Sequence, residues 1–100
     1  MGYRLTGEAR RDLQEIRDYT LRNWGARQSK DYLRQLQALM TRLSEMTGLG
    51  QSRSDDLSPG IYSFPYVSHM IYYRIQGADI VVMAVMHQSR LPGNHIVKNA

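Results

Sequence analysis

Residues 60–87 restrict the fold more than any other stretch of this chain. They contain three short runs rich in Val, Ile, Tyr and Phe, separated by residues 67–68 and by residues 76–79. Runs of β-branched and aromatic residues between short turn segments are typical of β-strands joined as hairpins. We therefore predict a three-strand antiparallel meander over residues 60–87.

The two short turns fix the expected register of this meander. In the first hairpin, the predicted pairs are Tyr62 with Tyr73, Phe64 with Ile71, and Tyr66 with His69. In the second hairpin, they are Ile71 with Ala84, Tyr73 with Val82, and Ile75 with Ile80. Side chains alternate between the two faces of a sheet, so these pairs also sort the residues by face.

One predicted face of the meander is a core face. It comprises Tyr62, Phe64, Tyr66, Ile71, Tyr73, Ile75, Ile80, Val82, Ala84 and Met86. The second face is apolar with a few polar groups, which is unusual for a surface in contact with water. It comprises Ile61, Ser63, Pro65, Met70, Tyr72, Arg74, Val81, Met83, Val85 and His87. This second face needs a cover, either from a partner or from the chain itself.

Two helices are predicted before the meander, over residues 7–24 and 26–46. The first carries one apolar stripe at helical spacing, made of Ala9, Leu13, Ile16, Thr20 and Trp24. Thr6 suits its N-cap, and Gly25 suits the position after its last turn, with Trp24 as a core anchor. The short link at Gly25 forces the two helices into an antiparallel hairpin, which we expect to pack on the core face.

The remaining segments complete a single α+β domain over residues 1–100. Residues 3–5 suit a short N-terminal strand, residues 47–59 a loop, and residues 88–100 a polar tail that we expect to be mobile. The expected order is strand, helix, helix and three strands. A chain of 100 residues with 42% hydrophobic residues provides for one core.

Composition excludes several classes of protein. The chain has no cysteine, which excludes disulfides and thiolate metal sites, and we expect a cytoplasmic location. No apolar run reaches about eighteen residues, so we expect no membrane association. The formal net charge is +4, and the basic residues are concentrated in the first half. That excess suits a nucleic acid or an acidic protein partner, or a solvated helix face.

Histidines and tyrosines offer two further possibilities. His69, His87 and His95 lack the i, i+3 or i, i+4 spacing of a helical metal site, so we expect no metal and no cofactor. Tyrosines of the meander are of the kind that stack on RNA bases. The predicted register places all of them except Tyr72 on the core face, where packing is their expected role.

Four stretches in this order carry a family resemblance. They are Ala9…Asp12-Leu13…Ile16…Tyr19, then Trp24-Gly25…Tyr32…Leu36, then Asp56-Leu57…Gly60-Ile61-Tyr62…Phe64…His69-Met70-Ile71-Tyr72-Tyr73-Arg74, and last Ile80…Val82…Val85-Met86-His87. Together they resemble the ParE branch of the RelE/ParE superfamily of bacterial toxins, over nearly the whole chain.

The resemblance implies the toxin of a type II toxin–antitoxin system, which inhibits DNA gyrase and blocks replication. It implies a ParD-like antitoxin that neutralises the toxin in a hetero-oligomeric complex, and contact with operator DNA only through that antitoxin. Such a toxin is not an enzyme and has no catalytic residues. Two alternatives remain: a RelE-like endonuclease that cuts mRNA on the ribosome, and an inactive homologue that only binds its antitoxin.

A RelE-like activity requires basic groups for the scissile phosphate, together with a general acid and a general base. In this chain the residues that would supply them are Tyr72, Arg74, His87 and Arg90. Arg74 is the only basic residue of the meander, and apolar side chains surround it on the second face. We therefore favour the ParE interpretation.

The second face of the meander is the predicted antitoxin-binding site. Its apolar side chains suit a partner segment that lies across the sheet, and Arg74 and His87 favour an acidic, amphipathic segment that folds on binding. The predicted contact residues are Ile61, Met70, Tyr72, Arg74, Val81, Met83, Val85 and His87.

Overall fold

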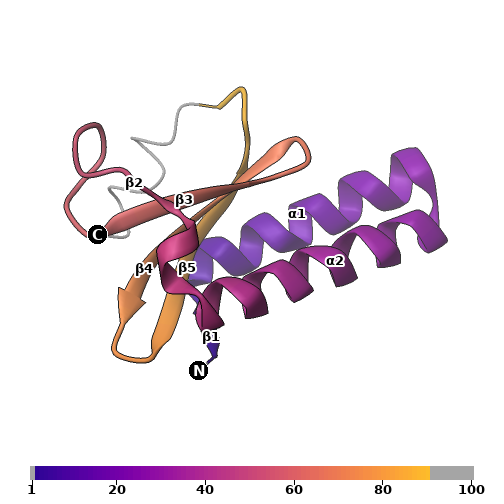
Figure 1. Ribbon diagram of the computed structural model, residues 1–100. Coiled ribbons are helices and arrows are strands. Elements are labelled where there is room, and N and C mark those ends of the chain that lie inside the picture. Colours follow the sequence, from indigo (N-terminus) through magenta and orange to yellow (C-terminus); the bar gives the residue numbers. More distant parts are fainter. Residues whose placement is uncertain (1, 91–100) are drawn as a thin grey trace.

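The computed structural model describes residues 2–90, and these residues form one sheet and a helical hairpin (Figure 1). The elements are β1 (Tyr3–Leu5), α1 (Gly7–Trp24), α2 (Ala26–Glu45), the 3₁₀ helix η1 (Thr47–Leu49), β2 (Gln51–Ser52), β3 (Ile61–Tyr66), β4 (His69–Gln76) and β5 (Asp79–His87). The α+β class and the predicted order of elements are confirmed. Most of the predicted tail, and His95 with it, lies outside the described residues.

The sheet has five strands in the order β1-β5-β4-β3-β2. β1 pairs with β5 in parallel, which brings the start of the chain beside its last strand, and the other pairs are antiparallel. The helical hairpin covers one face of this sheet (Figure 1). The predicted meander is therefore extended by one strand on each side. β1 pairs with β5, and the short strand β2, which lies inside the predicted loop 47–59, pairs with β3.

Thr6 fixes the start of α1 and ties it to the sheet. Its hydroxyl accepts a hydrogen bond from the N–H of Ala9 and donates one to the carbonyl of Met83. Gly25, with φ of 92°, separates α1 from α2, a backbone conformation that suits glycine. The predicted cap and the bounds predicted for the first helix are therefore confirmed, whereas the second helix ends one residue earlier than predicted, at Glu45. The role predicted for Trp24 as a core anchor is wrong, because 44% of the residue is exposed.

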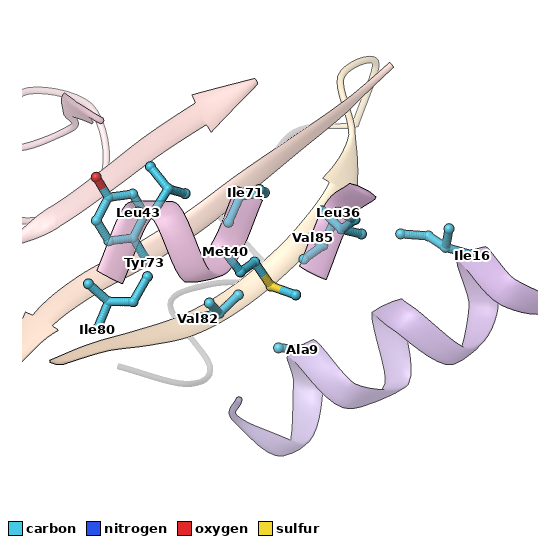
Figure 2. Packing of buried hydrophobic residues seen from close by; sticks show 10 residues of the cluster. All are labelled: Ala9, Ile16, Leu36, Met40, Leu43, Ile71, Tyr73, Ile80, Val82 and Val85. Carbon is cyan, nitrogen blue, oxygen red and sulfur yellow. The ribbon is translucent and has the colours of Figure 1, made fainter. Parts of the chain in front are cut away.

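The main core lies between the helical hairpin and the sheet (Figure 2). It comprises Ala9, Ile16, Leu36, Met40, Leu43, Ile71, Tyr73, Ile80, Val82 and Val85. Phe64 packs against it from β3. The predicted orientation of Phe64, Ile71 and Val82 toward the helices is confirmed. Leu36, Ile71 and Tyr73 have no exposed surface, so each contributes its full apolar burial to folding.

The first hairpin has the predicted register at every pair, but the second does not. Tyr73 pairs with Val82 as predicted, whereas Ile71 pairs with Val85 instead of Ala84. A β-bulge at Tyr72/Tyr73 is the reason, because it leaves Met83 as an extra residue in β5. One extra residue turns every later side chain to the opposite face.

The bulge corrects four predicted positions at the end of β5. Val85 belongs to the main core on the helix side, and His87 lies on the same side, beside His69. Ala84 and Met86 belong instead to a second buried cluster on the other face, with Ile61, Tyr72 and Met83. Val85 and His87 are therefore not on the predicted antitoxin-binding face.

Candidate functional site

The predicted antitoxin-binding face is closed at its centre. Ile61, Tyr72 and Met83 are at most 5% exposed, and Met70 packs against them. Val81 is partly buried and Arg74 is exposed. The expectation of a continuous exposed apolar strip is therefore wrong, although Arg74 remains accessible to a partner.

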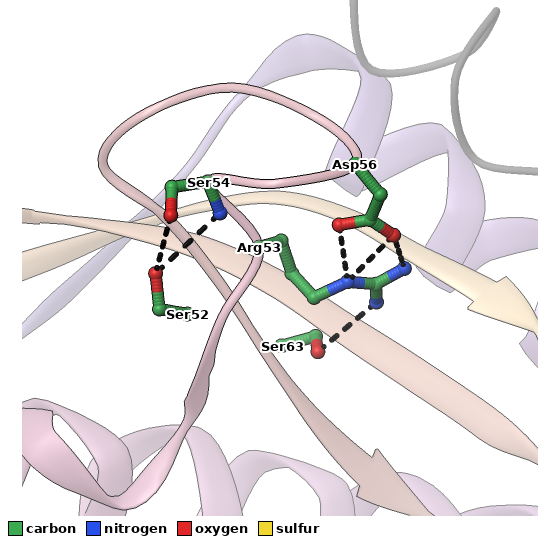
Figure 3. Close-up of polar contacts among 5 residues, drawn as sticks. All are labelled: Ser52, Arg53, Ser54, Asp56 and Ser63. Atoms are coloured by element: carbon green, nitrogen blue, oxygen red, sulfur yellow. Dashed lines mark hydrogen bonds and ion pairs between the residues drawn. The ribbon is translucent and has the colours of Figure 1, made fainter.

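The loop between β2 and β3 contributes to this closure through Arg53 (Figure 3). The guanidinium lies 5.5 Å from the centroid of the Tyr72 ring, a cation–π arrangement, and donates to the Ser63 hydroxyl at 3.2 Å. It also binds the carboxylate of Asp56, with Nε 3.0 Å from Oδ1. This guanidinium holds the pKa of the Asp56 carboxyl below its ordinary value. Arg53 therefore links the loop to the second face.

A pair of arginines flanks the open part of the same face. Val81 in β5 pairs with Arg4 in β1 on one side and with Arg74 in β4 on the other. Neighbouring strands lie about 4.8 Å apart, which puts the two arginine Cα atoms roughly 10 Å from each other. Sequence analysis missed Arg4, because a parallel pairing between the ends of the chain leaves no local signal. Two cations beside one partly buried apolar residue suit an acidic segment with an apolar anchor.

The four residues that a RelE-like activity would use do not meet. Tyr72 is buried on the second face, and Arg74 lies on that face further along β4. His87 pairs with His69 at the opposite end of β4, roughly 17 Å from Arg74 at the rise of an extended strand. A phosphate held by Arg74 is therefore out of reach of His87.

His87 and Arg90 instead line a groove of about 350 Å³ on the helix side of the sheet. We call this the α1–β5 groove. It lies between α1, the β3–β4 turn and the end of β5, and its lining residues are Asp12, Glu15, Ile16, Tyr19, Trp24, Ser68, His69, Val85, Met86, His87 and Arg90. Sequence analysis missed the groove, because the bulge that turns His87 toward α1 was not predicted.

Aromatic rings continue along one end of this groove. Ring centroids are separated by 6.3 Å for Tyr19 and Trp24, 5.4 Å for Trp24 and Tyr32, 5.9 Å for Tyr32 and His69, and 5.7 Å for His69 and His87. Tyr19 is 53% exposed and Trp24 is 44% exposed. Exposed Trp and Tyr side chains in a concave site are typical of binding surfaces.

Hydrogen bonds orient both histidines. The N–H of Ser89 donates to Nδ1 of His87 at 3.1 Å, so neutral His87 carries its proton on Nε2. Nδ1 of His69 lies 2.8 Å from the hydroxyl of Tyr32. Burial lowers the pKa of His69, and the neighbouring His87 lowers it further. The lowered pKa favours the neutral form of His69 in this groove.

The possible metal ligands between residues 2 and 90 are His, Asp and Glu side chains. Within that range, no three His, Asp or Glu side chains lie where they would hold an ion together. No described helix is long and apolar enough to cross a membrane.

Comparisons with known proteins agree on one family. A family model described as "ParE toxin of type II toxin-antitoxin system, parDE" matches residues 3–92. Toxin ParE1 of Caulobacter vibrioides is 35% identical over 94 residues, covering 94% of this chain and 96% of the relative. Toxin ParE1 of Mycobacterium tuberculosis is 34% identical over 87 residues, covering 86% of this chain and 88% of the relative.

Solved structures share the fold at lower identity. A chain from the chromosomal ParDE toxin–antitoxin system of P. aeruginosa superposes with a TM-score of 0.73 at 18% identity, covering 87% of this chain and 95% of the other. A chain of the RelBE2 toxin–antitoxin complex of Mycobacterium tuberculosis gives 0.60 at 21% identity, covering 89% of this chain and 92% of the other.

Proposed function

The chain belongs to the ParE toxin family of type II toxin–antitoxin systems, and on that premise we propose that it inhibits DNA gyrase without catalysing a reaction of its own. The match of the family model over residues 3–92 carries this proposal. Inhibition by binding needs a complementary surface on a folded domain, and no assembled acid–base site.

The separation of Tyr72 and Arg74 from His87 and Arg90 supports a toxin that is not an enzyme. Phosphodiester cleavage needs an acid, a base and a charge-stabilising group within hydrogen-bond reach of one phosphate. Arg74 lies toward one end of β4, whereas His87 in β5 pairs with His69 at the other end and lies on the opposite face of the sheet, and Tyr72 is buried.

The partner that neutralises this toxin is, in our proposal, a ParD-like antitoxin with an acidic, amphipathic segment. The segment lies over the row formed by Arg4, Val81 and Arg74, where two cations flank one apolar side chain. Met70, at the margin of the buried cluster, extends the apolar part of this surface. Ile61, Tyr72 and Met83 support the surface from below, without direct contact.

Controlled expression in bacteria tests the toxin proposal. The chain expressed alone is expected to arrest growth and to halt DNA replication, while protein synthesis continues at first. Co-expression of the antitoxin encoded beside it is expected to restore growth. Protein synthesis that stops before replication would instead favour a ribosome-directed activity. If circular dichroism shows that the chain is folded but its expression does not affect growth, the result would favour an inactive antitoxin-binding homologue.

A further inference from the structure

We propose that the α1–β5 groove binds a guanine nucleotide, either free or as one residue of a single strand. The proposal combines an acidic and aromatic wall on α1 with a wall of hydrogen-bond donors on the strand side. It concerns a site on the helix side of the sheet, away from the surface proposed for the antitoxin.

The α1 wall is formed by Glu15, Tyr19 and Trp24, which all line the groove. Glu15 and Tyr19 are four residues apart, so their side chains are neighbours on the helix surface. The Tyr19 and Trp24 rings meet at 80°, so a flat ligand in the groove can lie parallel to only one of them. Because both residues are about half exposed, a stacked base would bury aromatic surface that is now in contact with water.

The opposite wall presents His87 and Arg90. Both follow the β-bulge, which turns His87 toward the helix side of the sheet. With Nδ1 of His87 accepting from the Ser89 N–H, its Nε2–H is the donor left for a ligand. The guanidinium of Arg90 is exposed and offers a planar donor fork that suits phosphate oxygens. This wall therefore suits the anionic part of a ligand.

Charge distribution across the groove selects the kind of ligand. Carboxylates from α1, Glu15 and the buried Asp12, oppose the donors of the strand side. These carboxylates would repel a simple anion. A ligand with hydrogen-bond donors at one end and a phosphate at the other matches both walls. Nucleotides whose bases carry donors on the Watson–Crick edge have this polarity.

Among the common bases, guanine fits a carboxylate best. Its Watson–Crick edge offers N1–H and N2–H side by side, which match the two acceptor oxygens of an ionised Glu. Adenine offers one donor beside an acceptor nitrogen, which a carboxylate repels. Glu15 is therefore expected to be the residue that distinguishes guanine from adenine. The volume of the groove, about 350 Å³, is at the lower end of the range for small-molecule sites, as expected for one nucleotide.

Trp24 is the only tryptophan of the chain, so its fluorescence reports on this groove directly. Titration of the full chain with GMP is expected to quench Trp24, with calorimetry giving the same affinity. AMP should bind at least tenfold more weakly than GMP, and inorganic phosphate should leave the fluorescence unchanged. A short oligouridine with one guanine, compared with oligouridine alone, distinguishes a strand residue from a free nucleotide.

Variants on the two walls test the assigned roles. Glu15→Gln should lower the affinity for GMP at least tenfold, whereas Asp18→Asn, an exposed change on the same helix outside the groove, should leave it within twofold. Arg90→Gln should weaken the binding of GMP at least fivefold, but the binding of guanosine, which has no phosphate, less than twofold. All three positions are exposed, and circular dichroism verifies that the variants fold. The proposal is overturned if GMP at ~1 mM gives neither quenching nor heat, if AMP binds as tightly, or if Glu15→Gln has no effect.

Discussion

Asp12 on α1 and Val85 on β5 are joined by a hydrogen bond of 3.0 Å, in which the backbone N–H of Val85 donates to the carboxylate. Asp12 is 5% exposed and Val85 is 3% exposed, so this hydrogen bond is shielded from bulk water. A buried donor that loses a charged partner costs about 2–3 kcal/mol. We therefore predict that Asp12→Ala lowers the free energy of unfolding by about that amount, as measured by urea denaturation.

The exposed Asp18 on the same helix provides the matched control. Asp18→Ala is expected to change the free energy of unfolding by less than about 0.5 kcal/mol, as is usual for surface positions. An equally small effect of Asp12→Ala would contradict the role of this bond in joining α1 to β5 beyond the bulge.

Gly50 is predicted to resist substitution because of Tyr73. A Cβ atom at Gly50 would clash with the Tyr73 hydroxyl oxygen, which accepts from the Gly50 N–H and donates to the carbonyl of Thr47. The ring of Tyr73 has no exposed surface and no room to retreat. Gly50→Ala should therefore destabilise the fold by about 1–3 kcal/mol through overpacking.

Gly48 is the control, because a Cβ there meets nothing within 4 Å. Gly48→Ala is expected to be neutral, or stabilising by up to about 1 kcal/mol through the loss of freedom in the unfolded chain. Thermal melts of both variants check the difference, and equal melting temperatures would show that Tyr73 does not constrain Gly50.

Stability is predicted to fall when the pH drops below 6.5, the ordinary pKa of histidine. Burial, and then His87, lower the pKa of His69 in the folded chain, so the unfolded chain takes up a proton first. Stability is therefore complete above pH 6.5 and decreases as the pH falls from there toward the lowered pKa of His69.

His69→Asn removes this titration, so the variant should lose less in melting temperature than the wild type between about pH 7.5 and pH 5.5. The variant lacks the contact with Tyr32, which lowers its melting temperature at every pH. The readout is therefore the change of melting temperature with pH. An identical change in the wild type and the variant would contradict the assignment of this pH dependence to His69.

Antitoxin binding is predicted to depend on Val81, the apolar residue between Arg4 and Arg74. A charge at this position would repel an acidic segment and remove its apolar contact, so Val81→Asp should weaken binding by about 1–3 kcal/mol. Isothermal titration calorimetry with the antitoxin measures the change. Met83 is less suitable for this test, because it is 1% exposed and a charge there would disturb folding.

Ile75 offers the control for that measurement, since it is 40% exposed and alternation along β4 puts it on the opposite face from Arg74. Ile75→Asp is expected to leave antitoxin affinity within about threefold, which is less than 1 kcal/mol. An affinity of Val81→Asp within the same limit would place the antitoxin elsewhere on the domain.

The fold was predictable from sequence because its signals are local. The helical stripes, the Thr6 cap, the Gly25 link and the first hairpin each depend on residues close together in the chain. The bulge in β5 was not predictable, because no local signal marks the extra residue, and the Asp12–Val85 hydrogen bond that follows it joins residues distant in the sequence. That single extra residue places Val85 and His87 on the helix side, where both line the α1–β5 groove.

The candidate site was predicted only in part for the same reason. Arg74, Val81 and Met70 lie on the expected face, but closure of its centre involves Arg53 in a segment predicted only as a loop. Arg4 joined the surface through a parallel pairing between the ends of the chain. Contacts of this kind require the tertiary structure.

Supercoiling of relaxed plasmid by purified DNA gyrase tests the central claim most directly, when it is run beside ribosome-dependent cleavage of mRNA with the same preparation of toxin. We predict that the chain inhibits supercoiling, that its antitoxin relieves the inhibition, and that the message stays intact. Arg74→Ala and His87→Ala then have no cleavage to abolish. Cleavage of the message that is lost in either variant, with supercoiling unaffected by the wild type, would contradict the claim and identify a RelE-like endonuclease.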